Sequence, residues 1–297
     1  MKIPPRLQPL VDEGLVDAVV DRLMSGKEAD VFVVRCGGEL RCAKVYKDAA
    51  KRSFKKAATY AEGRRSRSGR RQRAMERGSR YGRAERESAW QSAEIDALRR
   101  LANAGVRVPE TYGVLDGVLL MELIMGDDGL EAPRLGEISM DREQALEDHA
   151  IMLGYIVTML CEGLIHGDLS PFNVLVDPEG PVIIDLPQAI DASANNSARA
   201  FLIRDVTTIN EYYAEFAPEL KGLRYGEEIW ALYEDGGLHP EVTLTGAFED
   251  PDGPADIDAV LAEIQATLAE EEARRERTAA ENEDEEGGEP PPPWLQG

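Results

Sequence analysis

Three polar residues suited to metal-assisted phosphoryl transfer lie in the middle of the chain. Asp168 and Asn173 are separated by four residues, and Asp185 directly follows the apolar run 182–184. The spacing Asp-x4-Asn is typical of a kinase catalytic loop, in which the aspartate handles the proton of the acceptor hydroxyl and the asparagine binds metal. Asp185, at the end of a buried strand, can present a carboxylate to magnesium. The segment therefore predicts a centre for phosphoryl transfer from ATP.

The surroundings of this spacing determine how specific it is. An isolated Asp-x4-Asn pair is common in turns, where short polar side chains bond to the backbone. Here His166 precedes the pair, Pro171 favours a loop, and a predicted hairpin leads to Asp185. This combination favours the catalytic interpretation. We expect His166 to hold the loop through hydrogen bonds and not to transfer a proton.

A single lysine interrupts an apolar strand of the N-terminal part. Lys44 lies in the run 42–46, where an unpaired ammonium group would be costly to bury. A helix predicted over residues 83–104 carries Glu94 among its apolar positions, so we expect Glu94 to pair with Lys44. Glu87 on the same face is the rival partner. The simpler alternative is that either acid forms a solvated pair with an arginine.

Two further segments are candidates for contacts with the nucleotide. Ser25, Gly26 and Lys27 join the first two predicted strands, where a loop over the phosphates belongs. One glycine in place of three makes this loop weak support, and an ordinary hairpin turn is an equal interpretation. Residues 121–124, at the end of the last strand of the first lobe, would offer backbone groups to adenine. Taken alone, this segment is interpreted as core.

The elements that must position these residues divide the chain into two lobes. Short runs rich in Val, Phe and Ala between residues 16 and 46 predict three antiparallel strands. Residues 111–115 and 118–124 flank a Asp-Gly turn and add two more strands. Together with the long helix they form a five-stranded antiparallel N-lobe.

The second lobe is predicted to be small and mostly helical. Helical spacing occurs over residues 141–163, 197–216 and 227–233, with two short strands around the turn 177–180. The predicted fold class is therefore α+β, a two-lobe protein-kinase-like fold.

We predict three parts along the chain. The N-lobe, with the ATP loop and a flexible basic insert at 47–83, covers residues 1–124, and the catalytic C-lobe covers 125–248. Residues 249–297 form an acidic tail that we expect to be largely disordered because it has low hydrophobicity and high charge.

Charge is distributed unevenly. The formal net charge is -22, yet residues 47–86 contain 15 Lys or Arg against 4 Asp or Glu. A mostly acidic chain argues against broad affinity for nucleic acid, whereas the basic segment can meet phosphate locally. The three cysteines lack disulfide or metal-ligand spacing, and no apolar run is long enough to cross a membrane. We expect a soluble cytoplasmic protein with no membrane contact.

The motifs taken together resemble the RIO family of atypical serine/threonine protein kinases, and most closely its type-1 subfamily. In that family a Ser-Gly-Lys-Glu loop replaces the glycine-rich loop, so the weak segment at residues 25–28 becomes a marker. The matching stretches are SGKEADVFVV, CAKVYK, AGVRVPETYGVLDGVLLMELIMG, LIHGDLSPFNVLV, VIIDLPQAID and FLIRDVTTI.

The resemblance implies a role for each candidate residue. It implies that Lys44 contacts the phosphates of ATP and pairs with Glu94, and that Asp168 accepts the proton. Asn173 and Asp185 are the implied ligands of magnesium, with manganese as the alternative metal. The implied hinge contacts are made by the backbone of Glu122 and Ile124.

The resemblance also implies an activity. We predict an ATP- and magnesium-dependent serine/threonine kinase that phosphorylates itself, with Ser66, Ser68 and Ser79 in a basic loop of the kind that family members phosphorylate. Some members are thought to act mainly as ATPases through an aspartyl-phosphate, here at Asp185. Leu186-Pro187 after this aspartate departs from the usual motif without removing a reactive group.

Two other functions stay open at this point. A small-molecule phosphotransferase of the aminoglycoside or choline type shares the His-Gly-Asp-Leu segment, although such enzymes usually have a larger helical lobe. A scaffold that binds RNA or the ribosome through the basic loop 63–83, with vestigial activity, is the third hypothesis. A solvated loop is the simpler interpretation of that segment.

Overall fold

The computed structural model describes residues 3–26, 29–47 and 93–249, all of which belong to one compact unit. Several predictions therefore lie outside the described residues: the contribution of Lys27, the rival acid Glu87, the basic insert beyond residue 47, its three serines, and the tail from residue 250. No helix of the described part is long and apolar enough to cross a membrane.

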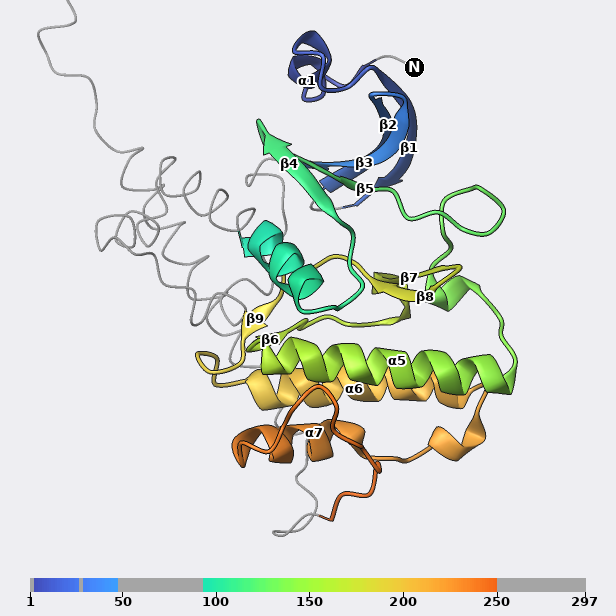
Figure 1. Cartoon of the computed structure of the whole chain (residues 1–297), viewed down its shortest axis with the longest axis vertical. Helices are drawn as coiled ribbons and strands as arrows, with labels where there is room; N and C mark the ends of the chain where they lie inside the picture. The colour runs from blue at the N-terminus through green and yellow to red at the C-terminus, as the bar shows by residue number, and fades with distance from the viewer. Residues whose placement is uncertain (1–2, 27–28, 48–92, 250–297) are drawn as a thin grey trace, which may run out of the picture. The chain divides into compact units, whose positions relative to one another are not determined.

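Five antiparallel strands form the sheet of the N-terminal part (Figure 1). In chain order they are β1 (Ala18–Ser25), β2 (Ala29–Cys36), β3 (Glu39–Tyr46), β4 (Thr111–Leu115) and β5 (Val118–Glu122). The sheet order β1-β2-β3-β5-β4 leaves β1 and β4 at the edges. Asp116 and Gly117 both have positive φ, 48° and 75°, which explains the tight Asp-Gly turn between β4 and β5. The predicted five-stranded antiparallel sheet is confirmed.

The two faces of this sheet have different partners. Directly opposed residues on neighbouring strands share a face. Phe32, Ala43 and Leu120 form one such row, and they pack with Leu7 and Leu10 around helix α1 (Gln8–Asp12). The neighbouring row, Val31, Lys44 and Leu119, lies on the opposite face. Lys44 therefore points away from the α1 side.

A helix follows the undescribed segment and covers the Lys44 face. Its described part runs over residues 93–103 and ends before Gly105, whose φ of 87° suits a left-handed helix terminus. Leu98 and Leu101 are buried in the cluster that also contains Leu119 of β5. The same helix carries Glu94, which is only 2% exposed.

The C-terminal part is mostly helical. Its helices are α5 (Arg142–Cys161), α6 (Ala198–Ala214) and α7 (Tyr225–Glu234), and α5 and α6 lie side by side with α7 packed on α6 (Figure 1). The Asp141 carboxylate accepts a hydrogen bond from the amide of Gln144 at 2.9 Å and so caps α5 at the residue where the helix was predicted to begin.

Four short strands lie beside these helices, and the polar loops connect them. β6 (Leu164–Ile165) pairs with β9 (Ile190–Asp191), and β7 (Val174–Asp177) pairs with β8 (Gly180–Ile183). The 3-10 turn η3 (Pro171–Asn173) leads directly into β7. The catalytic-loop candidates thus lie between β6 and β7, and Asp185 follows β8. The predicted α+β, kinase-like arrangement is present, whereas its exact domain boundaries stay a prediction.

Candidate active site

The ammonium group of Lys44 is held between two carboxylates. Its Nζ donates to Glu94 Oε1 at 2.6 Å and to Asp185 Oδ1 at 2.8 Å, although these residues are 50 and 141 positions away in the chain. Burial lowers the pKa of Lys44, but the charges of Asp185 and Glu94 raise it well above its ordinary value. Lys44 therefore remains a cation inside an apolar strand.

Glu94 has a second donor that sequence reasoning missed. The hydroxyl of Tyr46 donates to Glu94 Oε2 at 2.7 Å, and the side chain of Tyr46 is fully buried. Each oxygen of the carboxylate thus has its own donor, which fixes the orientation of the acid. Tyr46 ends the same apolar strand as Lys44, and nothing in its spacing distinguishes it from a core residue.

Asp185 combines a partner in the interior with access to solvent. Its side chain is 45% exposed, against 2% for Glu94. Burial raises the pKa of Asp185, but the charge of Lys44 and the hydrogen bond that Lys44 donates lower this pKa by more. The pKa of Asp185 is therefore below its ordinary value. Asp185 also has φ of 64°, a left-handed conformation that is uncommon outside glycine and often marks functional sites. The backbone thus aims an ionised carboxylate into the space beside Lys44.

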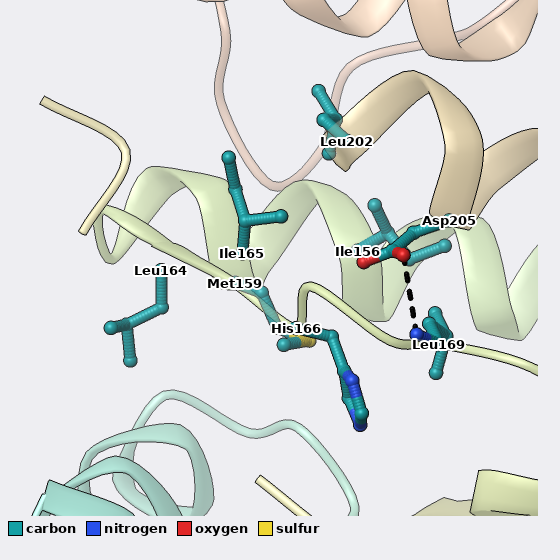
Figure 2. A pocket seen from close by; sticks show the side chains of 8 residues that line it. All are labelled: Ile156, Met159, Leu164, Ile165, His166, Leu169, Leu202 and Asp205. Carbon is teal, nitrogen blue, oxygen red and sulfur yellow. Dashed lines mark hydrogen bonds between the residues drawn. The ribbon is translucent and has the colours of Figure 1, made fainter. Parts of the chain in front are cut away.

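The catalytic-loop candidates are held by a buried aspartate of helix α6. Asp205 Oδ2 accepts from the amide of Gly167 at 2.7 Å and Oδ1 accepts from the amide of Leu169 at 3.2 Å. Figure 2 shows the Asp205 carboxylate directed at the Leu169 backbone, beside a small apolar pocket behind the loop. Arg204 donates to the Gly167 carbonyl from the same helix. The backbone amides of the residues before and after Asp168 are therefore both held by Asp205.

Asp205 was not among the predicted site residues. An acid between apolar residues of the segment FLIRDVTTI was the available signal, since an acid on a buried helix face requires a partner. Burial raises the pKa of Asp205, while the charge of Arg204 and the hydrogen bond from the Gly167 amide lower it less.

His166 bridges the catalytic loop and the strand that ends at Asp185. Its Nε2 lies 3.0 Å from the carbonyl oxygen of Ile184, and its Nδ1 accepts from the amide of Asp168 at 3.3 Å. The two contacts are compatible when the proton is on Nε2. The side chain is 2% exposed. This geometry is that of a residue that holds the loop, which is the role expected for His166.

Asn173 and Asp185 supply oxygen atoms of the kind that magnesium binds. The Asn173 side-chain amide donates from Nδ2 to the carbonyl of Asp168 at 2.8 Å, which leaves its Oδ1 as the metal-binding atom. The carbonyl of Asn173 accepts from the amide of Ile184, so the loop and the strand end are tied together. No cluster of three or more His, Cys, Asp or Glu suited to a metal occurs among the described residues. A metal here would need the phosphates of a nucleotide to complete its oxygen ligands, and the residues present fit that arrangement.

The predicted phosphate loop begins with an ionic cluster. Ser25 Oγ donates to Asp30 Oδ1 at 2.6 Å, and Arg22 Nη2 contacts the same oxygen at 2.5 Å. Lys47 Nζ donates to the carbonyl of Gly26 at 2.6 Å and lies 3.2 Å from Asp30. The Ser25 hydroxyl is thus part of a network that holds the turn, and the rest of the loop lies outside the described residues.

The two hinge candidates differ in their backbone contacts. The Ile124 carbonyl accepts from the amide of Ala132 at 2.9 Å, so the group that Ile124 can offer to adenine is its amide. The amide of Glu122 donates to Glu110, which leaves its carbonyl for the same purpose. The Glu122 side chain has a separate role: Arg107 binds both of its oxygens, at 2.8 and 2.9 Å, and also reaches Asp177 of β7.

A family model described as "RIO domain" matches residues 30–224, which include Lys44, Glu94, Asp168, Asn173 and Asp185. The chain belongs to the RIO domain family. The match runs from the start of β2 to the residue before α7, and so covers both parts of the fold around the site. This RIO domain has the kinase-like architecture that the sequence predicted.

The chain is similar to curated proteins of this family. It is 33% identical over 215 residues to the RIO-type serine/threonine-protein kinase Rio1 of Haloferax volcanii, which covers 72% of this chain and 69% of that protein. The human serine/threonine-protein kinase RIO1 is 26% identical over 239 residues, 78% of this chain but 39% of the human protein. The chain also matches the crystal structure of a kinase domain, with 14% sequence identity and a TM-score of 0.40. The match covers 69% of this chain and 65% of the chain in that structure. The fold assignment rests on the family match and on the topology described above.

Proposed function

We propose that this RIO domain is an ATP- and magnesium-dependent serine/threonine protein kinase. The observation that carries the proposal is the double contact of Lys44 with Glu94 and Asp185, at 2.6 and 2.8 Å. It brings a phosphate-binding cation beside a candidate metal ligand, and a lysine paired with a helix acid is a shared part of kinase sites. The names of the archaeal and human relatives support the same activity.

Each residue has a chemical task in this proposal. Asp168 orients the acceptor hydroxyl and takes its proton, while Asn173 and Asp185 hold the metal through oxygen atoms. Lys44 binds the phosphates, with Glu94 keeping its ammonium group in place. Magnesium, when bound, neutralises charge that builds up on the phosphates.

Two backbone segments bind the remainder of the nucleotide. The Glu122 carbonyl and the Ile124 amide contact adenine, and the phosphate loop that the sequence predicts at Ser25, Gly26 and Lys27 covers the phosphates. The contact of Lys47 with the Gly26 carbonyl supports a turn that is held in shape without additional glycines.

Incubation with ATP and magnesium, followed by intact-mass measurement and assignment of the modified residues, tests the activity. We expect phosphate on serine or threonine in the wild-type chain and none in Asp168→Asn. The matched control is Arg142→Gln. Arg142 is a surface residue of α5 that pairs with Glu219, and this variant should keep the modification. Equal phosphate in wild type and Asp168→Asn would refute the assignment. Rapid turnover of an aminoglycoside or choline-like metabolite would instead favour the small-molecule phosphotransferase.

A second activity at the same site is ATP hydrolysis through an aspartyl-phosphate. Its support is the exposure of Asp185, which is ionised and 45% accessible while the other partner of Lys44 is buried. A carboxylate oxygen of Asp185 would attack the terminal phosphorus, ADP would leave, and water would hydrolyse the acyl-phosphate. Phosphate that is released by hydroxylamine and mapped to Asp185 is the expected product. Phosphate stable to hydroxylamine on serine alone would contradict it.

An RNA or ribosome contact is a separate proposal that rests on composition. Residues 63–83 are rich in arginine and lie outside the described residues. We expect salt-sensitive RNA binding that is lost when this segment is deleted. Binding that survives the deletion would contradict the proposal. A cytoplasmic location is likewise a prediction from the sequence.

A further inference from the structure

A second cation, Arg134, lies next to the candidate site and was not among the predicted residues. Its Nη1 donates to the carbonyl of Phe172 at 2.7 Å, and its Nη2 contacts the sulfur of Met24 at 3.1 Å. One guanidinium group therefore joins strand β1 of the N-terminal part to the catalytic loop. Met24 is 110 positions and Phe172 is 38 positions away from Arg134 in the chain.

The backbone of Arg134 is fixed from both sides. Its amide donates to Glu137 Oε2 at 3.2 Å, and its carbonyl accepts from the Glu137 amide at 2.9 Å. An isolated bridge pairs Arg134 with Leu175 of β7, two residues beyond Asn173. The base of this side chain is thus attached to the strand that follows the metal-binding candidate.

The sheet register shows that Arg134 reaches the face that carries Lys44. Met24 pairs with Val31, and Val31 pairs with Lys44. Because opposed residues share a face, Met24 and Lys44 project to the same side of the sheet. Met24 also directly precedes Ser25, where the predicted phosphate loop begins. The guanidinium group of Arg134 therefore lies between the start of that loop and the loop that contains Asp168.

The contacts of Arg134 leave its charge available. Within residues 3–26, 29–47 and 93–249, the groups that its side chain contacts are a carbonyl and a thioether, which carry no net charge, and a thioether is a weak acceptor. By contrast, Lys44 already contacts two carboxylates.

We propose that Arg134 binds the terminal phosphate of ATP and stabilises the phosphoryl group during its transfer. This inference rests on the proposed kinase function. The guanidinium group exchanges the Met24 sulfur for a phosphate oxygen, which is a far stronger acceptor for an arginine fork. In the reaction the acceptor oxygen bonds to the terminal phosphorus, the bond from that phosphorus to the oxygen of ADP breaks, and Asp168 takes the acceptor proton. Arg134 keeps all its protons and contributes charge only.

Binding of nucleotides with and without the terminal phosphate tests this assignment. Calorimetry would compare ADP with the non-hydrolysable β,γ-imido analogue of ATP, each with magnesium, in wild type, Arg134→Gln and Arg134→Lys. For Arg134→Gln we expect affinity for the analogue to fall about 10- to 100-fold and affinity for ADP to change less than about 2-fold, the size of a charge-assisted hydrogen bond. Arg134→Lys keeps the charge but not the two-pronged guanidinium group, so its affinity for the analogue should lie between those of wild type and Arg134→Gln. Phosphate transfer should fall with the same order.

The matched control is Arg142→Gln, because Arg142 is a surface arginine at the start of α5 that pairs with Glu219. It should leave both affinities and the rate unchanged. Thermal unfolding of each variant checks the fold, and the ratio of the two affinities within one variant is independent of the folded fraction.

Two results would overturn the inference, and they are distinguishable from failure of the proposed function. Equal losses for ADP and for the analogue in Arg134→Gln would show that Arg134 only holds the loops together. Unchanged affinities would show that it does not bind phosphate. In both cases wild type would still bind and use ATP. If wild type binds neither nucleotide, the kinase proposal fails and the role of Arg134 fails with it.

Discussion

Two regions of the molecule bury polar side chains in different ways. Around Lys44 the buried groups satisfy one another, since the ammonium contacts Glu94 and the Tyr46 hydroxyl takes the other oxygen of that acid. Among the helices α5, α6 and α7, several buried side-chain atoms have no hydrogen-bond partner within the part of the chain that the structure describes. They are His149 Nε2, Asn210 Oδ1, the Tyr213 hydroxyl and Trp230 Nε1.

The difference separates a site from a core. Lys44 and Asp185 keep their charges, and the paired groups have one orientation, which chemistry requires. In the helical core, burial instead disfavours the charged form: it lowers the pKa of His149 to about 4 and raises that of Tyr213. The following changes would break or sharpen this contrast.

The largest effect is expected from Glu94→Ala. The variant leaves Lys44 with the half-exposed Asp185 as its carboxylate contact, so a partly uncompensated ammonium stays in the apolar strand. Removing one partner of a buried ion pair costs about 3–5 kcal/mol, and we expect about 3 kcal/mol less free energy of unfolding in urea. The double variant Lys44→Met/Glu94→Ala removes both charges and should regain part of that stability without regaining phosphate transfer. A double variant less stable than the single one would contradict the pairing argument.

Asp205→Asn is expected to have the next largest effect. The new amide keeps one acceptor oxygen, so either the Gly167 or the Leu169 amide faces an NH2 group. An unsatisfied buried donor costs about 1–3 kcal/mol. Because the loop carries Asp168, kcat should fall more than KM for ATP rises. Asp148→Asn changes an equally buried aspartate of α5 and should spare kcat, and equal losses in both variants would argue against a specific role for Asp205.

The third prediction concerns the pH dependence of stability. The pKa of His149 is about 4 in the folded chain against an ordinary value of 6.5, because burial disfavours its charged form. Above pH 6.5 both states are neutral, whereas below it the unfolded chain binds a proton that the folded chain does not. Stability is therefore lost as the pH falls toward 4, by about 2 kcal/mol between about pH 7 and pH 5.

Urea unfolding across this pH range measures the loss. Asp148 and the tyrosines 213 and 225 lie near His149, and Asp148 has a raised pKa of its own. The difference between wild type and His149→Gln isolates the histidine, and it should shrink as the pH falls. A constant difference would show that His149 is not responsible.

The smallest effects come from one chemical change made in both regions. Tyr46→Phe and Tyr213→Phe each delete the hydroxyl of a fully buried tyrosine. Tyr46→Phe removes the donor to Glu94 and should cost about 1–2 kcal/mol. Tyr213→Phe deletes a hydroxyl that has no hydrogen-bond partner among the described residues and should be neutral or stabilising by up to about 1 kcal/mol. Equal losses of unfolding free energy would erase the contrast between the regions.

Much of the fold and the candidate site residues could be predicted because their signals are local. Alternating apolar residues and the Asp-Gly turn predicted β4 and β5, and the Asp141 cap marks the start of α5 where it was expected. Asp168 and Asn173 lie in the short segment between β6 and β7, and Asp185 follows β8, at spacings that the chain itself specifies. A lysine in an apolar strand also predicts a carboxylate partner, because burying a lone charge is costly.

The tertiary structure decided which distant side chains meet. Tyr46 reaches Glu94 across 48 positions, Asp205 reaches the Gly167 amide across 38, and Arg134 reaches Met24 across 110. A tyrosine in a strand, an acid in a helix and an arginine in a loop have no spacing that identifies their partners. Their contacts arise only when sheet register and helix packing bring separate elements together. The sequence by itself therefore determined the candidate reactive groups, because their spacing is local, and packing determined the residues that hold them in place.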